Sequence, residues 1–450
     1  MDEPLLAFYG DDFTGSTDAL EGLALNGVRA MLFLDPPTSA ELAAVGDLDA
    51  VGVAGRSRSM SPEQMDETLP DVFRALGDLE PEMIHYKVCS TFDSAPDVGS
   101  IGRAIDVAQS TLDSPFVPVS QASTVPAGRY VAFGNLFAAE GDDVYRIDRH
   151  PTMRDHPTTP MRESDLRRHL GEQTDRDIGL VDLRQLERGA VSLPESEVVV
   201  FDAIAPRHLH TIGEFLWDRA TAADGPLFAV GSSGLEHHAL TTRWAETGAI
   251  PDTDSLLEPH PPVEQVAVVS GSASPVTDRQ IQRAADDGFA TLRLDAPRLV
   301  DPDEAAAARE DALDAALAAV EDGRSVVLYT ARGPDDPAIE RTRERYAALD
   351  CDESMGARLG REQGRVFRAL IAESGLERVC VAGGDTSGYV VPQLDAYALE
   401  PVAPTAPGAP LCRIHSHTDV FDGIEITLKG GQTGGENYFE ALRAGGVDPE

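Results

Sequence analysis

Two adjacent carboxylates flanked by glycines are the first residues in the chain whose types suggest chemistry. They lie in the segment GDDFTG (10–15), directly after a short apolar run. Paired carboxylates can hydrogen-bond sugar hydroxyls, bind Mg²⁺ or take a proton from an attacking hydroxyl. Capping of a helix needs only one Asp or Thr, and two acids with two glycines exceed that need. We therefore expect Asp11 and Asp12 to be functional.

Basic residues follow two later apolar runs. Arg56 and Arg58 lie in GRSRS (55–59), where guanidinium groups can grip a carboxylate, although a solvated turn explains them equally well. Lys87 opens the segment KVCSTFDS (87–94) and is one of only two lysines in the chain. Because arginine replaces lysine nearly everywhere else, a lysine that persists indicates a need for a compact point charge.

Three segments in the second half of the chain have the composition of phosphate-binding loops. They are SGSASP (270–275), GGDTSG (383–388) and KGGQTGG (429–435), which contains the other lysine, Lys429. Small residues let backbone N–H groups and hydroxyls approach a phosphate at a helix N-terminus. A helix capped before Pro275, or capped by Asp385, would look similar. Several such loops in one half of the chain favour a nucleotide site.

These segments need elements that bring them together, and the hydrophobic pattern supplies them. Short apolar runs alternate with amphipathic stretches, which is typical of α/β domains with largely parallel sheets. Ligands bind at the carboxyl ends of such strands, where all of these segments lie. Strands are predicted at 5–9, 29–34, 50–54, 83–88, 116–119, 178–181, 197–201, 227–230, 266–270, 290–294, 325–330, 378–382, 411–416 and 425–429. Helices are predicted at 16–26, 62–76, 100–110, 163–170, 206–221, 275–287, 302–322, 357–374 and 435–443.

A proline-rich stretch interrupts this alternation and predicts two domains. Residues 247–264 contain four prolines and little periodicity, as expected of a linker. We expect an N-terminal domain at 1–246 and a C-terminal domain at 265–450, which contains the phosphate-type loops.

The charge of the chain excludes several partners. Asp+Glu number 77 against 37 Lys+Arg, for a net charge of −40, which repels nucleic acids and anionic membranes. Extreme acidity with almost no lysine resembles the proteins of a salt-rich, halophilic cytoplasm. No apolar run approaches the roughly 18 residues of a membrane span, and none resembles a secretory signal. The four cysteines form no CxxC pair, so neither a disulfide scaffold nor a zinc ribbon is expected.

Taken together, the motifs resemble those of the four-carbon acid sugar kinase family. GDDFTGSTDAL resembles its opening ADDxTGAxD motif, SGSASPVTDRQI its SGSxSxxTxxQ stretch, AGGDTSG its GG[DE]TS loop, and LKGGQTGGENYF its LKxGxFGxxxFF end. The resemblance preserves the order of the motifs along essentially the whole chain. It implies ATP-dependent phosphorylation of a short sugar acid, with Mg²⁺ as the accompanying ion. It also implies that 1–246 is the substrate domain and 265–450 the nucleotide domain, with both ligands in the cleft between them.

The resemblance also implies roles for individual residues. Catalysis falls to Asp12 or Asp11 as the base, with Lys87, and the acid is held by Arg56, Arg58, Ser90 and Thr91. ATP is held by Ser270, Gly271, Ser272, Ser274, Gly383, Gly384, Asp385, Thr386, Lys429 and Gly431. No resident metal site is expected, and whether the chain forms a homo-oligomer stays open.

Two departures from the family pattern bear on the substrate. Many members have KxxDSTLRGN where this chain has KVCSTFDSAPDVGS, and CSTFDS resembles the branch acting on 3-oxo acids such as 3-oxo-tetronate; the family FG near the end is Thr433-Gly434 here. Related acids such as threonate, erythronate and 3-oxo-isoapionate stay open. So do a ribokinase-like kinase of a neutral sugar and a non-catalytic sugar-acid sensor. A nicotinamide-dependent oxidoreductase is disfavoured because no GxGxxG follows a strand.

Overall fold

Two compact units make up the protein, Met1–Leu256 and Leu257–Glu450. A computed structural model describes residues 3–124, 127–156, 159–189, 191–250, 255–349, 351 and 353–446. The division between the units falls inside the segment 247–264 expected to be a linker, of which residues 251–254 lie outside the described part. Flanking parts of that segment are docked rather than free: the Leu256 N–H donates to Ala24 O, and the Val263 N–H to Arg443 O.

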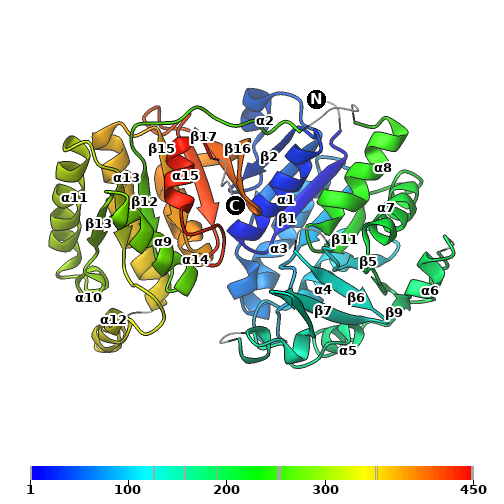
Figure 1. The fold of residues 1–450 in the computed structure, drawn as a ribbon. Coiled ribbons are helices and arrows are strands. Elements are labelled where there is room, and N and C mark those ends of the chain that lie inside the picture. Colours follow the sequence, from blue (N-terminus) through cyan, green and yellow to red (C-terminus); the bar gives the residue numbers. More distant parts are fainter. Residues whose placement is uncertain are drawn as a thin grey trace. The chain divides into compact units, whose positions relative to one another are not determined.

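The first unit is organised around a parallel sheet (Figure 1). Its strands lie in the order β2-β3-β1-β4-β11-β5-β10-β9. They are β1 Leu6–Gly10, β2 Ala30–Phe33, β3 Ala50–Ala54, β4 Met83–Lys87, β5 Val117–Ser120, β9 Ile178–Val181, β10 Val198–Phe201 and β11 Leu227–Gly231. The connection from β1 runs to one side of the sheet and β4 lies on the other, so the β1–β4 boundary is a topological switch point, where such sheets bind ligands.

Helices of the first unit form two groups that contact within themselves. One contains α1 Phe13–Leu25, α7 Pro206–Ala220, η4 Leu235–Ala239 and α8 Leu240–Thr247. The other contains α3 Pro62–Gly77, α4 Ile101–Thr111 and α5 Leu166–Gly171. Short helices α2 Ser39–Val45 and α6 Leu183–Leu186 complete the unit. Buried apolar strands with helices between them are what the predicted alternation requires.

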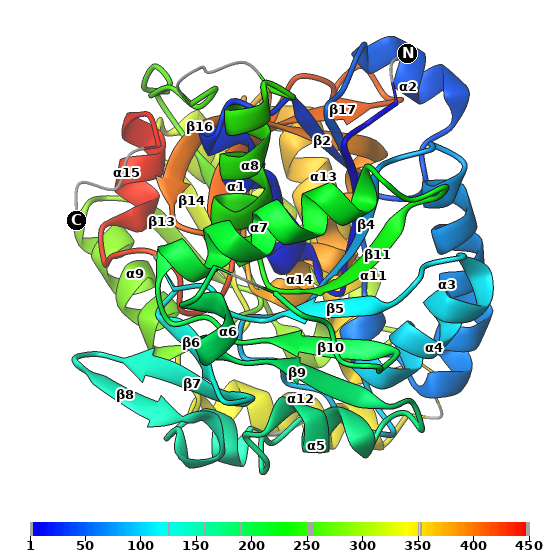
Figure 2. The same ribbon diagram turned by 90° about the vertical axis from the view of Figure 1, so that its right-hand side faces the viewer.

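A small antiparallel sheet was not predicted (Figure 2). It contains β6 Arg129–Ala132, β7 Asn135–Glu140 and β8 Asp143–Arg146. Backbone bonds tie it to the loops that follow the main sheet: the Arg129 N–H donates to Ser123 O at 2.8 Å, and Val131 exchanges bonds with Ala203. The small sheet is therefore fixed near the carboxyl ends of β5 and β10.

The second unit has a mixed sheet in the order β13-β14-β12-β15-β18-β17-β16. The first five strands in this order, β13, β14, β12, β15 and β18, pair in parallel, and β17 is antiparallel to both of its neighbours, β18 and β16. They are β12 Ala267–Ser270, β13 Ala290–Arg293, β14 Val326–Tyr329, β15 Arg378–Ala382, β16 Ala396–Ala406, β17 Ala409–Ser416 and β18 Glu425–Lys429. The helices are α9 Pro275–Asp286, α10 Ala296–Leu299, α11 Ala305–Glu321, α12 Pro337–Ala347, α13 Met355–Ser374, α14 Gly384–Val390 and α15 Tyr438–Ala444.

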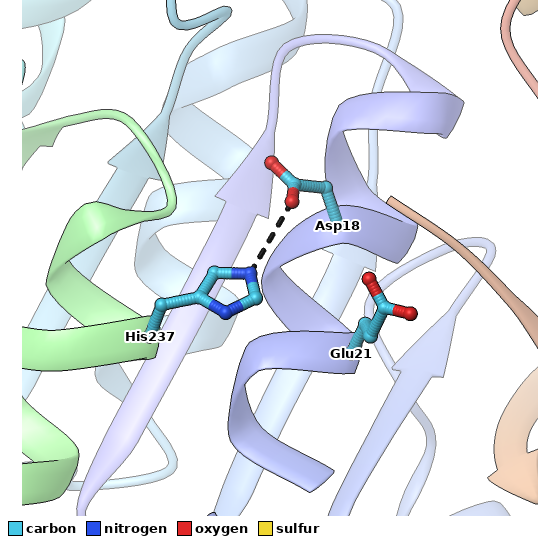
Figure 3. Close-up of side chains that lie close together, drawn as sticks. All are labelled: Asp18, Glu21 and His237. Atoms are coloured by element: carbon cyan, nitrogen blue, oxygen red, sulfur yellow. Dashed lines mark hydrogen bonds and ion pairs between the residues drawn. The ribbon is translucent and has the colours of Figure 1, made fainter. Parts of the chain in front are cut away.

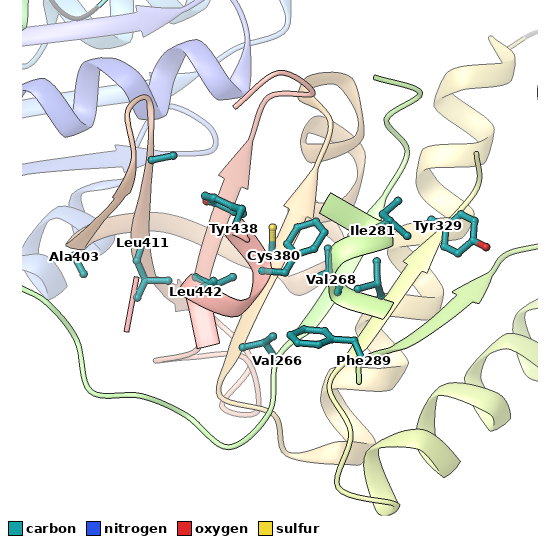
Figure 4. Close-up of a cluster of buried hydrophobic side chains, with 14 residues drawn as sticks. Val266, Val268, Ile281, Phe289, Tyr329, Cys380, Ala403, Leu411, Tyr438 and Leu442 are labelled. Atoms are coloured by element: carbon teal, nitrogen blue, oxygen red, sulfur yellow. The ribbon is translucent and has the colours of Figure 1, made fainter. Parts of the chain in front are cut away.

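An apolar core holds the second sheet against α9 and α15 (Figure 4). Val268 and Cys380 contribute from the strands, and Ile281 and Leu442 from the helices. The predicted fold class of two α/β units with largely parallel sheets is confirmed. Within the described residues, no helix is both long and apolar enough to cross a membrane.

Candidate active site

The strand register of the first unit places the predicted functional loops at one edge. Gly10 of β1 is opposite Ala54 of β3 and Lys87 of β4, Lys87 is opposite Gly231 of β11, and Gly231 is opposite Ser120 of β5. The strands run in parallel, so the loops after all five leave the sheet together. Residues far apart in the sequence therefore become neighbours.

Asp12 caps helix α1 and also faces basic residues. Its Oδ1 accepts from the Gly15 N–H at 2.7 Å, and its Oδ2 accepts from the Thr14 hydroxyl at 2.9 Å. Helix α1 starts at Phe13, three residues before the predicted start, because this cap satisfies its first turn. The alternative interpretation of Asp12 as a helix cap is thus correct, and the carboxylate also contacts Arg58.

Arg58 binds both carboxylates. Its Nη2 lies 3.2 Å from Asp11 Oδ1 and 2.9 Å from Asp12 Oδ1. Burial raises the pKa of Asp11 to about 6, even though Arg58 opposes that shift. The Arg58 guanidinium is committed to this pair, whereas Arg56 is exposed. The substrate grip expected of the two arginines is therefore not evident for Arg58.

Lys87 is buried at the N-terminal end of α1. Only 3% of its side chain is exposed, and its Nζ lies 3.2 Å from Asp18 Oδ2. A Cβ added at Gly15 would stand 2.8 Å from this Nζ and 2.4 Å from Asp12 Oδ1. Gly15 therefore allows the ammonium group to approach Asp12. Burial opposes the charge, but Asp18 and Asp12 raise the pKa of Lys87 above its ordinary value.

Asp18 was not predicted as a site residue, and it anchors Lys87. Its other oxygen lies 3.3 Å from His237 Nε2, which comes from the π-helical turn η4 (Figure 3). Asp18, Glu21 and His237 offer ligand atoms within 4.8 Å of one another. The Lys87 ammonium already supplies positive charge at Asp18, so we assign this cluster to positioning Lys87 rather than to a metal. The signal that the sequence offered for Asp18 was its place as the last acid of GDDFTGSTD, the segment that resembles ADDxTGAxD.

The loop after Lys87 is held by internal hydrogen bonds. The Thr91 hydroxyl donates to Asp93, and the Thr159 hydroxyl donates to the other oxygen of Asp93 at 3.1 Å. Burial alone would raise the pKa of Asp93, but Arg58 and Thr91 hold it below the ordinary value. Thr91 therefore shapes the loop, and Ser90 is half-buried beside it.

Three predicted loops converge in the second unit. A Cβ at Gly271 would lie 2.2 Å from Thr386 Oγ1, and one at Gly431 would lie 2.7 Å from Ser272 Oγ. Gly383 has φ +130°, which favours glycine, and Gly384 begins α14. Ser274 caps α9, and Ser270 is buried at the end of β12. The residues expected around ATP thus share one location, except that Asp385 lies in the first turn of α14 and is not its cap.

Lys429 is buried among these loops, and none of the described acidic residues pairs with it. Its Nζ donates to Gly430 O at 2.9 Å and to Thr277 Oγ1 at 3.3 Å. Burial lowers the pKa of Lys429 to about 8. Within the described residues it forms no salt bridge, which is unusual in so acidic a chain. Such a charge is suited to an anionic ligand.

A cavity of about 300 Å³ adjoins the same loops. Gly271, Asp385 and Thr386 line one part of it, and apolar groups such as Ile339, Met355 and Leu359 line the rest. An apolar cleft beside small-residue loops and a buried lysine can accept a flat base on one side and phosphates on the other.

Family models match the two parts of the chain separately. Residues 6–239 match a family model described as a sugar-binding N-terminal domain, and residues 267–439 match a nucleotide-binding C-terminal domain. The 3-oxo-isoapionate kinase of Paraburkholderia graminis is 44% identical, over 98% of this chain and 94% of that protein. The 3-oxo-tetronate kinase of Cupriavidus necator is 32% identical, over 98% and 97%.

Solved structures show the same fold. A crystal structure from Salmonella typhimurium LT2 has a TM-score of 0.74 at 24% identity, covering 97% of this chain and 98% of that one. A Haemophilus influenzae protein has a TM-score of 0.70 at 24% identity, covering 97% and 99%. The two domain models and the relatives aligned along nearly the whole chain establish that this protein belongs to the four-carbon acid sugar kinase family.

Proposed function

We propose that this sugar acid kinase transfers the γ-phosphoryl group of ATP to a hydroxyl of a short 3-oxo sugar acid. The observation that carries the ATP assignment is Lys429, a buried cation with no salt bridge among the described residues, surrounded by loops that need glycine. The ATP phosphates would meet Lys429 and the 270–274 and 383–386 loops, with the base in the adjoining cavity.

The residues at the edge of the first sheet would prepare the acceptor. Asp12 is the base we assign, because its side chain is 16% exposed whereas that of Asp11 is 5% exposed. Arg58 holds the Asp12 carboxylate in place from one side, Lys87 lies close to it, and Asp11 fixes Arg58. The transfer depends mainly on positioning and on charge stabilisation.

Mg²⁺ fits this arrangement as an ion carried on the nucleotide. Asp385 is an exposed carboxylate on the loop beside Thr386, and carboxylates together with phosphates are the ligands that Mg²⁺ prefers. The ion would offset the negative charge of the transferring group. Lys429 would offset the same negative charge from the protein side. We place the reaction in a salt-rich cytoplasm.

The relatives suggest which acid to test first. Identity to the 3-oxo-isoapionate kinase is 44%, against 32% and 31% for two 3-oxo-tetronate kinases. We therefore propose 3-oxo-isoapionate as the first candidate substrate and 3-oxo-tetronate as the second.

ADP release from Mg-ATP in molar KCl tests the proposal. The panel contains 3-oxo-isoapionate, 3-oxo-tetronate, threonate and erythronate, with neutral sugars as controls and Lys429→Met as the matched inactive variant. Turnover of one acid that is lost in the variant supports the proposal and identifies the substrate. Turnover of a neutral sugar alone would replace it with a ribokinase-like activity. Binding of an acid without any turnover would favour a sensor.

A further inference from the structure

Arg129 is an exception among the arginines of this acidic protein. Within the described part of the chain it is the one arginine that is not exposed and yet forms no salt bridge with an acid. Arg58, by comparison, is held by two carboxylates. A partly buried guanidinium in a chain with 77 acidic residues has ample opportunity to pair, so its isolation requires an explanation.

Within the described structure, Arg129 is hydrogen-bonded through Nη1 and not through Nε. Its Nη1 donates to the backbone carbonyls of Ala127 at 2.7 Å and Ala139 at 3.2 Å. Its Nε is buried and has no partner among the described residues. Burial lowers the pKa of Arg129, against the attraction of Cys89 and Glu140. The Cys89 thiol is two residues beyond Lys87, so the guanidinium lies near the loop that carries Lys87.

Gln121 repeats this pattern on the neighbouring loop. It is fully buried, its Nε2 donates to Cys89 O at 2.7 Å, and its Oε1 has no partner in the described structure. Ser120 Oγ and Thr124 Oγ1 are also buried, and neither has a partner among the residues that the structure describes. These are four buried polar atoms without a hydrogen-bond partner in the described parts of one short segment. That is more than a stable protein core usually contains, because each such atom costs about 1–3 kcal/mol of folding free energy.

The strand register ties this segment to the active-site edge. Ser120 is opposite Gly231, and Gly231 is opposite Lys87. We propose that Gln121 and Arg129 form the substrate-recognition side of the site, where Arg129 binds the carboxylate of the sugar acid and Gln121 Oε1 accepts a hydrogen bond from one of its hydroxyls. This inference rests on the proposed function. It assigns the carboxylate grip not to Arg58, which already binds Asp11 and Asp12, but to an arginine whose Nε has no partner in the described part of the chain.

The test compares an acid with a neutral analogue. Arg129→Gln keeps an amide that can donate to the backbone carbonyls but removes the charge. We expect KM for the sugar acid to rise roughly 100-fold, whereas KM for its carboxamide and the Kd for ATP stay within about twofold. KM for the sugar acid in Arg129→Lys should lie between the values of the wild type and of Arg129→Gln. Arg219→Gln is the matched control, because Arg219 is exposed and only stacks on Phe215 in the same unit.

Two results would overturn the inference while leaving the kinase activity intact. One is an unchanged KM for the acid in Arg129→Gln. The other is an equal loss for the acid and the carboxamide, which is what a purely structural role predicts. If the wild type turns over none of the acids, calorimetric measurement of their binding tests the recognition role of Arg129 separately from catalysis. Weaker binding in Arg129→Gln than in Arg219→Gln supports the recognition role, and equal or absent binding rejects it.

Discussion

The Asp12 side chain has a structural role as a helix cap and, in the function proposed above, a chemical role as the base, and the two can be separated. Asn caps a helix about as well as Asp, so Asp12→Asn should keep α1 while removing the carboxylate charge. We expect kcat to fall by about 10²–10⁴-fold, the usual contribution of a general base, with the Kd for ATP nearly unchanged. Steady-state kinetics and calorimetry measure the two quantities.

Asp165→Asn is the control for that experiment. Asp165 is also an N-cap in the first unit, where it accepts from the Arg167 N–H at 3.1 Å at the start of α5. Its variant should retain kcat. A normal kcat in Asp12→Asn would show that Asp12 is a cap alone and would shift the base assignment to Asp11.

Lys429 should make ATP binding depend on pH. Because burial lowers its pKa to about 8, the free protein loses the ammonium charge above that pH. A bound phosphate favours the charged form, so affinity is full below pH 8 and decreases as pH rises through it. We expect the Kd for ATP to rise toward tenfold per unit between about pH 8 and 9.5.

Calorimetry across this range, with Lys429→Arg beside the wild type, checks the origin of the effect. Arginine stays charged throughout, so the Kd of that variant should be flat with pH whatever its absolute value. A flat profile in the wild type would mean that Lys429 does not contact the nucleotide.

At the scale of residues, the sequence indicated sites where composition was unusual. Lys87 and Lys429 stood out as the only lysines, and both are buried in the loops that were singled out. Arg129 could not stand out, because arginine is the usual basic residue of this chain. That it has no described acidic partner can be seen only in the structure. Asp18 was hidden in a helical pattern, where an acid normally faces solvent.

At the scale of elements, glycines keep the nucleotide loops close together, and one substitution tests this. In Gly271→Ala the new Cβ would lie 2.2 Å from Thr386 Oγ1, so the 270–274 and 383–386 loops must separate. We expect the Kd for ATP to rise by roughly 10–100-fold, the equivalent of about 1–3 kcal/mol of overpacking. Equilibrium titration with ATP measures the change.

Gly356→Ala provides a control at the same cavity. Gly356 also lines it, but an added Cβ would meet nothing within 4 Å. Its Kd should stay within about twofold of the wild type. Equal losses in the two variants would indicate that any added methyl group disturbs the unit and that loop contact is not the cause.

Elements that obey simple periodicity were predicted well. Strands expected at 50–54, 178–181, 378–382 and 425–429 coincide with β3, β9, β15 and β18. Strand β16 was missed because Pro401 and Pro404 argue against a strand, yet its pairing with β17 shifts register around both prolines. The β6–β8 sheet was missed because its strands are short and only partly buried, so no strong alternation marks them.

At the scale of the whole molecule, the proline-rich segment contains the point where the chain divides into two compact units, but its composition does not show how the segment is held. Leu257 is buried, and Arg378 donates to Pro261 O at 2.9 Å. Composition reports the lack of a helix or strand period in this segment. It does not report backbone bonds made to residues more than a hundred positions away.

The surplus of acids should make the stability of the whole molecule depend on salt. The formal charge of −40 remains after the arginines have paired, and like charges repel across the folded surface more strongly than across an expanded chain. The Debye length falls from about 10 Å at 0.1 M salt to about 3 Å at 1 M, which suppresses this repulsion. We therefore expect Tm, measured by circular dichroism, to rise by on the order of 10 °C over that range.

KCl and NaCl at equal ionic strength should give the same Tm, because screening depends on ionic strength and not on the cation. A Tm that is constant with salt would mean that the acids are neutralised within the fold, and a large difference between the two salts would point to specific cation binding instead of screening.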